Sequence, residues 1–555
     1  MSLSHLTNRR RTDLAQPFPA DWNSHDEFFC YTRGRFITNE SHEMAIRHVK
    51  FNMNELAKCA AKSIGPDSAH CVRIDKFPDG MFNKTFLFTM DNGAQVVGKV
   101  PNPNAGRAHY TTASEVATMD FVRSKLGTPV PKVLAWSSKA SENSVGAEYV
   151  IMEKVSGLQL DKIWPNMDIK ERFELVKTIS GYQKSWMSTS FSQYGSLYYS
   201  SDLPDCDECT LSKADGSEVK EHGFSVGPST GREFLDDGRM ALDFDRGPWD
   251  TVEQYKTAVG LREIACVQNI SELPKSPVSL YGPGTYRPSR SKKTAVLESY
   301  LRLLRFFLPL DRSISSSYLW HPDLHAENIF VNPERPAEVL GIIDWQSSEL
   351  LPLFDHAREP YFLDFDGSYS GSLNPPQLPD NFDQLDPVEQ GKAKSLYLKN
   401  SLVTLYRKFT LAKNETLFKA MDFRRSTSFE MMLLAQNLLV DGESLYLSRI
   451  LQLQDEWSCL PGVSASGYPP FPIQFSEAEA ASINKDSTGA IRGMEIMRQL
   501  KESLGDLWPE KGVVRSDQYD QTKERLKQAK TELIDRLSRS EAERAAWEDA
   551  WPFDE

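Results

Sequence analysis

The chain has 555 residues, 40% of them hydrophobic, which is ordinary for a globular protein but too long for one simple core. Its formal net charge of −13 argues against nucleic acid or an anionic membrane as the main partner. No run of 18 apolar residues is present, so no integral membrane segment is expected, and seven scattered cysteines indicate a reducing compartment.

Residues 1–65 are expected to form an N-terminal extension that packs on the next domain. The first 15 residues carry three arginines but no apolar core, which excludes a secretory signal and leaves a short mitochondrial presequence open. An aromatic stretch at 26–40 then precedes apolar residues at helical spacing, which predict one helix over 42–62.

Five strands are predicted next, and together they would form a small antiparallel sheet. They are expected at residues 72–77, 85–90, 95–100, 131–136 and 148–155. Asn92-Gly93 between the second and third strands is a strong hairpin signal. The turn before the second strand contains Gly80, which would either bring backbone N–H groups close to phosphates or merely close the turn.

Two charged residues stand in apolar patterns. Lys99 lies in the third strand, where alternation alone does not decide whether it is paired or points to solvent. In the helix predicted over 111–126, Glu115 shares an apolar stripe with Met119, but it also matches a capping box begun by Thr112. An inward Glu115 would need a cationic partner, and Lys99 is the nearest candidate.

Ser156-Gly157 ends the strand pattern and indicates a hinge into a second, mainly helical domain. Helices are predicted at 169–187, 251–269, 293–308, 388–411 and 429–450. The segment 194–250 is rich in Gly, Ser and Asp and is expected to supply substrate-specific loops or a lid. Charged amphipathic helices at 476–504 and 516–547 would pack on the second domain or bind a protein partner.

A β-hairpin carries the candidate chemistry, because apolar runs at 329–332 and 339–343 flank a polar turn. With a register symmetric about the turn, Asn328 and Asp344 become cross-strand partners, and their oxygen atoms suit Mg²⁺. Asp323 lies five residues before Asn328 and can accept the proton of an attacking hydroxyl. One base beside two metal ligands is an arrangement used for phosphoryl transfer.

This part of the chain resembles a known family. The pattern His-Pro-Asp323-Leu-His-Ala-Glu-Asn328, followed by Ile-Ile-Asp344-Trp, resembles the catalytic loop and metal aspartate of the protein-kinase-like fold, in the form found in aminoglycoside and choline phosphotransferases. The resemblance implies an α+β, bilobal fold with a five-stranded antiparallel N-lobe at 66–155 and a larger, mainly helical C-lobe at 156–455. Residues 456–555 would be a C-terminal helical extension.

The opening of the chain carries a second resemblance. The segment 29–36, Phe-Cys-Tyr-Thr-Arg-Gly-Arg-Phe, and Asn39-Glu40 resemble the start of the fungal altered-inheritance-of-mitochondria kinase-like group within that branch. This resemblance implies a mitochondrial location, with the cytoplasm as the alternative.

The family resemblance also implies a role for each site residue. Asp323 would take the proton of the acceptor hydroxyl, and Asn328 and Asp344 would hold Mg²⁺ against the phosphates of ATP. Lys99 would bind the α- and β-phosphates, and Glu115 would orient the lysine.

Further positions are implied around the nucleotide. Gly80 would lie over the phosphates, and adenine would bind backbone at the hinge near Glu153 and Val155. His321, the first residue of the catalytic loop, is expected to order that loop.

The implied function is transfer of the γ-phosphate of ATP to a hydroxyl of a small molecule, since the Phe-Gly and Ala-Pro-Glu signatures of protein kinases are absent. Three acidic residues, Asp355, Asp364 and Asp366, hint at a cationic acceptor, although a solvated acidic loop is the alternative. The rival function is a pseudokinase that binds nucleotide or acts as a scaffold through its terminal helices.

Overall fold

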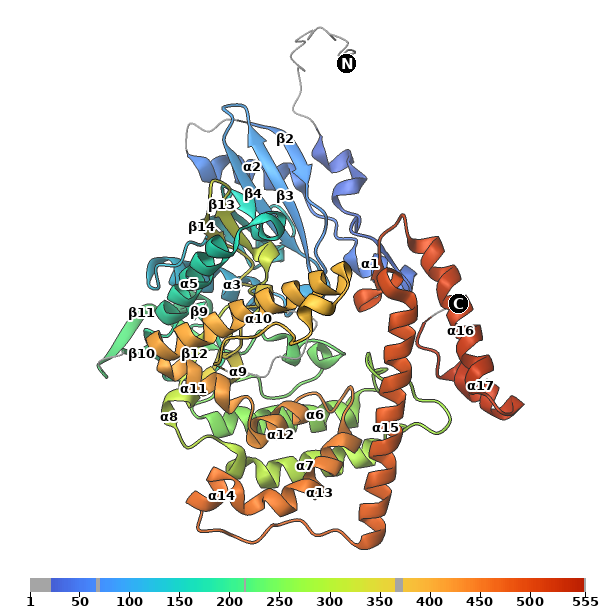
Figure 1. Ribbon diagram of the computed structural model, residues 1–555. Coiled ribbons are helices and arrows are strands. Elements are labelled where there is room, and N and C mark those ends of the chain that lie inside the picture. The colour runs from blue at the N-terminus through green and yellow to red at the C-terminus, as the bar shows by residue number, and fades with distance from the viewer. Residues whose placement is uncertain (1–20, 66–69, 214–215, 365–372, 554–555) are drawn as a thin grey trace.

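The computed structural model describes residues 21–65, 70–213, 216–364 and 373–553. The described part combines several β-sheets with many helices, which confirms the α+β prediction. In Figure 1 a sheet occupies one end of the molecule and helices fill the other. No helix within these ranges is long and apolar enough to cross a membrane. The presequence prediction and Asp366 fall outside the described residues.

The sheet at one end of the molecule has five antiparallel strands in the order β2-β3-β4-β6-β5. Its strands are β2 (Cys71–Lys76), β3 (Asn83–Met90), β4 (Gln95–Pro101), β5 (Val133–Ser137) and β6 (Tyr149–Glu153). Phe86 and Phe88 of β3 are fully buried because alternate residues of a strand face the same side. Helix α3 (Tyr110–Ser124) packs on β5 and β6 and carries Glu115.

The single helix predicted over 42–62 is wrong, because two helices occupy this segment. They are α1 (Glu40–Arg47) and α2 (Met53–Ile64). The side chain of Asn52 accepts the backbone N–H of Glu55 at 3.2 Å and so begins a new helix. An asparagine in this capping position satisfies an N–H group that would otherwise lack a partner.

The single helices predicted over 429–450 and over 516–547 are also wrong, because each segment forms two helices. The structure has α12 (Thr427–Ala435), α13 (Glu443–Glu456), α16 (Tyr519–Leu537) and α17 (Glu541–Asp549). Gly442 interrupts the first pair in a left-handed conformation with φ of +102°. Ser540 caps α17 by accepting the N–H of Glu543 at 3.2 Å.

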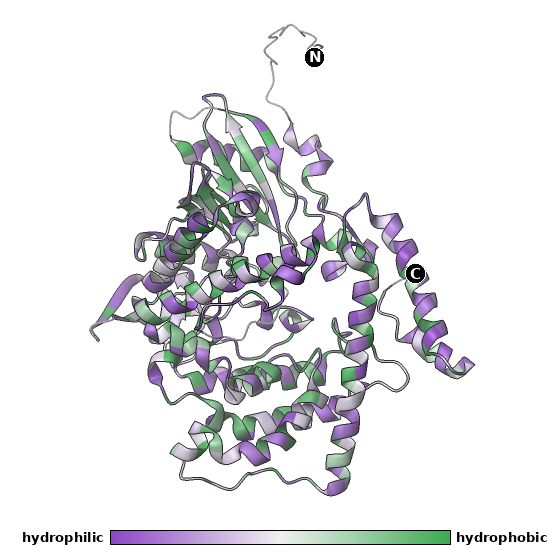
Figure 2. Cartoon of the chain, viewed as in Figure 1, coloured by the Kyte–Doolittle hydropathy of each residue, from purple (hydrophilic) through white to green (hydrophobic). Residues whose placement is uncertain are grey.

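The larger half of the molecule is built on long helices that lie within a few residues of their predicted positions. They are α5 (Ile169–Trp186), α6 (Val252–Asn269), α7 (Arg290–Phe307) and α10 (Pro387–Lys413). Hydrophobic residues of α6 and α7 face their neighbours in this region (Figure 2). Under the catalytic loop, the ring of Trp186 meets those of Trp320 and Trp345 edge to face, with centroids 5.2 and 5.6 Å apart.

The second, mainly helical part of the molecule also contains a six-stranded sheet that the sequence analysis did not predict, in the order β15-β12-β8-β10-β11-β9. Its strands are β8 (Thr189–Phe191), β9 (Ser196–Tyr199), β10 (Glu208–Lys213), β11 (Glu218–Gly227), β12 (Ser317–Leu319) and β15 (Leu350–Pro352). Three of these strands come from the predicted insertion at 194–250. Strand β12 precedes the loop that contains Asp323, which we call the candidate catalytic loop, and β15 follows the loop that contains Asp344, which we call the metal loop. The sheet to which the insertion contributes therefore supports both sides of the hairpin.

The two terminal extensions pair with each other. Strand β1 (Arg35–Phe36) is antiparallel to β16 (Val513–Val514). The guanidinium of Arg35 lies 3.5 Å from the ring centroid of Tyr519 in α16 and binds Glu40 at 2.6 Å. Helix α15 (Glu477–Leu504) packs on α13 and runs along one side of the molecule to this junction (Figure 1). We call the paired segments the terminal clasp.

Gly34 permits the clasp, because a Cβ at this position would lie 2.2 Å from the carbonyl oxygen of Val514. We expect Gly34→Ala to cost about 1–3 kcal/mol of stability, as overpacking does. Hydrogen exchange should show faster exchange in β16. The control is Gly391→Ala in α10, where nothing lies within 4 Å of the new Cβ. Unchanged exchange in β16 of Gly34→Ala would contradict this role.

Candidate active site

The candidate hairpin is present, but its register differs from the prediction. Its strands are β13 (Ile329–Asn332) and β14 (Arg335–Ile342). The N–H of Ile343 donates to the carbonyl of Asn328 at 3.0 Å, so the predicted pairing of Asn328 with Asp344 is wrong by one residue. Irregular pairing at Phe330, Val331 and Asn332 removes the symmetry about the turn.

Asp344 instead turns toward Lys99 just beyond the end of β14. Its φ of +63° is left-handed, which is uncommon for a residue other than glycine and is often found at functional sites. The ammonium of Lys99 donates to Asp344 Oδ1 at 3.1 Å and to Glu115 Oε1 at 2.7 Å. One lysine therefore links the five-stranded sheet, α3 and the metal loop.

Lys99 and Glu115 are both buried, whereas the side chain of Asp344 is 46% exposed. The capping-box alternative for Glu115 is wrong, because His109 is the N-cap residue of α3. Burial lowers the pKa of Lys99, but the carboxylates of Asp344 and Glu115 outweigh it and leave the pKa raised. The lysine therefore remains a cation at neutral pH.

His321 orders the catalytic loop, as the sequence predicts. Its Nδ1 accepts the backbone N–H of Asp323 at 3.1 Å, and its Nε2 donates to the carbonyl of Ile343 at 2.9 Å. Burial lowers the pKa of His321 to about 4, so the ring is neutral and can make both bonds.

Asp323 has a partner that the sequence analysis missed. His325 Nε2 lies 3.2 Å from Asp323 Oδ2, and the side chain of Asp323 is 55% exposed. The hydrogen bond from His325 lowers the pKa of Asp323, and the same bond raises the pKa of His325. The spacing of two residues within one loop was the available sequence signal.

Asn328 and Asp344 fit a magnesium ion by their chemistry. The amide nitrogen of Asn328 donates to the carbonyl of Asp323 at 2.9 Å, which leaves its Oδ1 as a ligand. Oδ1 of Asp344 accepts a hydrogen bond from Lys99, so the second carboxylate oxygen, Oδ2, is the one that could bind the metal ion. Such oxygen ligands suit Mg²⁺, which also takes ligands from substrate phosphates.

Gly80 does not have the free N–H group that a phosphate contact requires. Its N–H donates to the carbonyl of Asn83 at 3.1 Å, so this glycine closes the turn. The adjacent Asp79 is buried and accepts the N–H of Thr32 at 2.8 Å. The side-chain nitrogen of Asn83 donates at 2.6 Å to the side-chain oxygen of Gln346, which lies two residues after Asp344 in the metal loop. The N-terminal extension and the metal loop therefore hold the 77–82 turn in place.

The two residues predicted to form the hinge, Glu153 and Val155, lie at the end of β6 and two residues beyond it. The carboxylate of Glu153 accepts the N–H of Lys132 at 3.0 Å. Val155 lies against Gly341 of β14, where an added Cβ would be 2.5 Å from its methyl group. Val155 therefore packs on the strand that leads to the metal loop.

A cavity of about 560 Å³ opens beside the catalytic loop, and both Asp323 and Asp344 line it. This volume is within the range of about 300–1,000 Å³ that small-molecule sites occupy. The insertion contributes Arg232 to its wall, and the C-terminal extension contributes Lys511. The other predicted site residues do not line this cavity: Gly80, Lys99, Glu115, Asn328, Glu153 and Val155.

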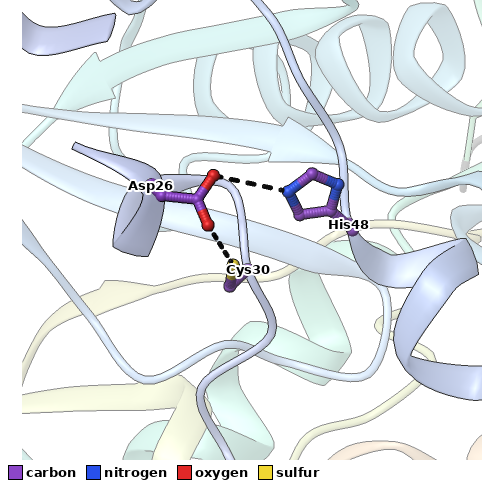
Figure 3. Close-up of side chains that lie close together, drawn as sticks. All are labelled: Asp26, Cys30 and His48. Carbon is purple, nitrogen blue, oxygen red and sulfur yellow. Dashed lines mark hydrogen bonds and ion pairs between the residues drawn. The ribbon is translucent and has the colours of Figure 1, made fainter. Parts of the chain in front are cut away.

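Another close group of side chains lies in the N-terminal extension. Figure 3 shows Asp26 between Cys30, whose thiol is 3.2 Å away, and His48, whose Nε2 is 3.8 Å away. These residue types can ligate transition metals. None of the three lines the cavity, so they are not part of the candidate active site.

No family model matches the chain, but several fungal proteins are similar over most of its length. A subtelomeric hrmA-associated cluster protein of Aspergillus fumigatus is 29% identical over 517 residues, which cover 87% of this chain and 97% of that protein. "Altered inheritance of mitochondria protein 9, mitochondrial" of Yarrowia lipolytica is 26% identical, with 83% of this chain and 81% of that protein covered. The chain is thus similar to these fungal proteins over most of its length. The resemblance predicted from its opening residues is therefore confirmed.

Solved structures with some likeness to the chain include a GDP and kanamycin complex of an aminoglycoside 2″-phosphotransferase, at 11% identity and a TM-score of 0.32. That likeness covers 80% of this chain and 98% of the other. A macrolide 2′-phosphotransferase of Brachybacterium faecium gives 12% identity and a TM-score of 0.26, with 69% and 98% covered.

The pairing of Asp323 with His325 predicts a pH dependence. Because the folded-state pKa of His325 is raised, the stability that the pair contributes is complete below the ordinary histidine pKa, and it is lost as pH rises through the raised value. We expect Asp323→Asn to lower the pKa of His325, measured by NMR of labelled histidines. His222, paired with Glu208 elsewhere, is the internal control. An unchanged His325 pKa would contradict the pairing.

Proposed function

We propose that the protein is an ATP- and Mg²⁺-dependent phosphotransferase that transfers the γ-phosphate to a hydroxyl group of a small molecule. The observation that carries the proposal is the ion pair of Lys99 with both Glu115 and Asp344, next to a cavity that Asp323 lines. Protein-kinase-like enzymes use this set of side chains for phosphoryl transfer.

Within this proposal, each side chain has one task. Lys99 binds the α- and β-phosphates, and Glu115 holds its ammonium in place. Asp323, kept ionised by its lowered pKa, accepts the proton of the acceptor hydroxyl. Asn328 and Asp344 hold Mg²⁺, which when bound offsets the negative charge of the phosphates. Phosphoryl transfer of this kind depends mainly on positioning and charge stabilisation.

The same proposal assigns the larger divisions of the chain. Residues 66–155 form the N-lobe, 156–455 the C-lobe, and 1–65 and 456–555 the terminal extensions. The nucleotide base would lie at the hinge near Glu153 and Val155, and the 77–82 turn would cover the phosphates without a contact from the N–H of Gly80, which is bonded to Asn83. The firm hold of the N-terminal extension on Asp79 supports a preformed phosphate turn.

We also propose a mitochondrial location. The names of the relatives from Yarrowia lipolytica and Saccharomyces cerevisiae include the word mitochondrial, and the latter relative is 23% identical over 89% of this chain. A fluorescent fusion of the full chain that stays in the cytoplasm would contradict this location.

Two substitutions separate nucleotide binding from catalysis. We expect Asp344→Ala to abolish the rise in melting temperature that ATP with Mg²⁺ produces, because a metal ligand is lost. Asp323→Asn should keep that rise and slow the hydrolysis of ATP, with water as acceptor, at least about 100-fold, as loss of a general base does. The matched control is Asp380→Ala, since Asp380 is exposed and lies outside the cavity.

The pseudokinase alternative predicts a different outcome. ATP with Mg²⁺ would then stabilise the wild-type protein, but Asp323→Asn would not change hydrolysis or transfer to any acceptor. No stabilisation by ATP in the wild-type protein would contradict both the phosphotransferase and a nucleotide-binding pseudokinase, and would leave the scaffold as the remaining function.

A further inference from the structure

Three cationic side chains that line the cavity make no ion pair within 4 Å in the described part of the chain, although carboxylates at longer range act on each of them: Arg358, Arg424 and Lys511. They come from two distant parts of the sequence. The fourth cation of the wall, Arg232, differs because it is paired with Asp236.

Most carboxylates of the same wall are already neutralised, apart from the catalytic pair Asp323 and Asp344. Their cationic partners are Arg232 for Asp236, Lys256 for Asp355 at 2.7 Å, and Arg407 for Glu359 at 3.0 Å. Burial raises the pKa of Glu349 well above its usual value, which favours its neutral form. Glu233 is the one remaining carboxylate of the wall. Asp344 is paired with Lys99, so apart from Glu349 the carboxylates of the wall without a lysine or arginine partner are Asp323 and Glu233, and they face three cations that make no ion pair with a described residue.

Arg358 and Arg424 are close enough to repel each other. Burial, and then the charge of Arg358, lowers the pKa of Arg424. The guanidinium of Arg424 is fixed, because it donates to the carbonyl groups of Phe354 at 3.0 Å and Asp355 at 2.7 Å. It also lies 4.4 Å from the ring centroid of Phe429. Two like charges held together beside a cavity are stabilised by an anion between or near them.

Lys511 reaches the cavity because the terminal clasp places it there. It has a left-handed φ of +52°, which costs about 1 kcal/mol or more in a residue other than glycine. The next residue, Gly512, accepts the N–H of Ile37 at 3.0 Å, and β16 then pairs with β1. The ammonium acts electrostatically on Asp323. A strained turn, anchored by the clasp that follows it, thus presents to the proposed base a cation without an ion pair among the described residues.

We propose that Arg358, Arg424 and Lys511 form a binding site for an anionic group, a phosphate or a carboxylate, that the acceptor carries besides its reacting hydroxyl. This inference rests on the proposed phosphotransferase function and names the chemical class of its substrate. It replaces the hint of a cationic acceptor, because Asp355, which supported that hint, is paired with Lys256.

The test uses inorganic phosphate as the probe and the full chain without nucleotide or magnesium. We expect calorimetry at constant ionic strength to show phosphate binding to the wild-type protein. Lys511→Met and Arg358→Gln should each raise the dissociation constant at least about tenfold, which corresponds to about 1.4 kcal/mol. Methionine keeps the Cβ, so the backbone strain at position 511 is unchanged.

The matched control is Lys527→Met, which removes the same charge from an exposed position of α16 outside the cavity. This variant should bind phosphate like the wild type. Equal affinity in the wild type and Lys511→Met, or equal loss in Lys527→Met, would overturn the proposal. Binding of tetramethylammonium in place of phosphate would also overturn it, in favour of a cationic acceptor at Glu233.

A second measurement separates the acceptor's anion from the γ-phosphate of ATP. For an acceptor site, phosphate binding persists with saturating ATP and Mg²⁺, and Lys511→Met binds ATP and ADP as the wild type does. If ATP competes with phosphate but ADP does not, the site binds the γ-phosphate of ATP. This result would overturn the assignment to the acceptor. The proposed function fails separately, if ATP and Mg²⁺ do not stabilise the wild-type protein while phosphate still binds.

Discussion

The ammonium of Lys99 is the contact on which the rest of the site depends. It joins the five-stranded sheet to α3 through Glu115 and to the metal loop through Asp344. Removing one partner from a buried ion pair costs about 3–5 kcal/mol, because a buried charge is left uncompensated. The relative position of sheet, helix and metal loop is therefore coupled to a single charge. The same charge is suited to phosphate oxygens, so under the proposed function the interaction that organises the site would also bind the nucleotide.

A second constraint comes from the ends of the chain. The terminal clasp brings β1 and β16 together, and the same N-terminal extension holds Asp79 of the 77–82 turn. The C-terminal extension then delivers Lys511 to the cavity. The extensions are thus structural parts of the candidate site, and the many hydrophilic residues of the C-terminal helices (Figure 2) do not by themselves indicate a partner protein.

The grouping of the candidate site residues could be predicted from the sequence because it depends on residue types at short spacing. Asp323, Asn328 and Asp344 lie within one loop and hairpin, and Lys99 and Glu115 interrupt apolar patterns that exclude unpaired charges. The features that the sequence did not predict depend on tertiary structure. The irregular pairing of the hairpin moved Asn328 opposite Ile343, and the sheet built from 194–250 has strands from distant segments. Lys511 lies 188 residues after Asp323 in the sequence, and no local pattern connects the two.

The central claim is phosphoryl transfer to a small hydroxyl compound, and one measurement tests it most directly. A fungal metabolite extract is incubated with Mg²⁺, ATP labelled in the γ-phosphate, and the wild-type, Asp323→Asn or Asp344→Ala protein. The account predicts a labelled small molecule that only the wild-type protein produces, with the phosphate on an alcohol oxygen and with a second, anionic group. Absence of any labelled product, or the same product with Asp323→Asn, would contradict it.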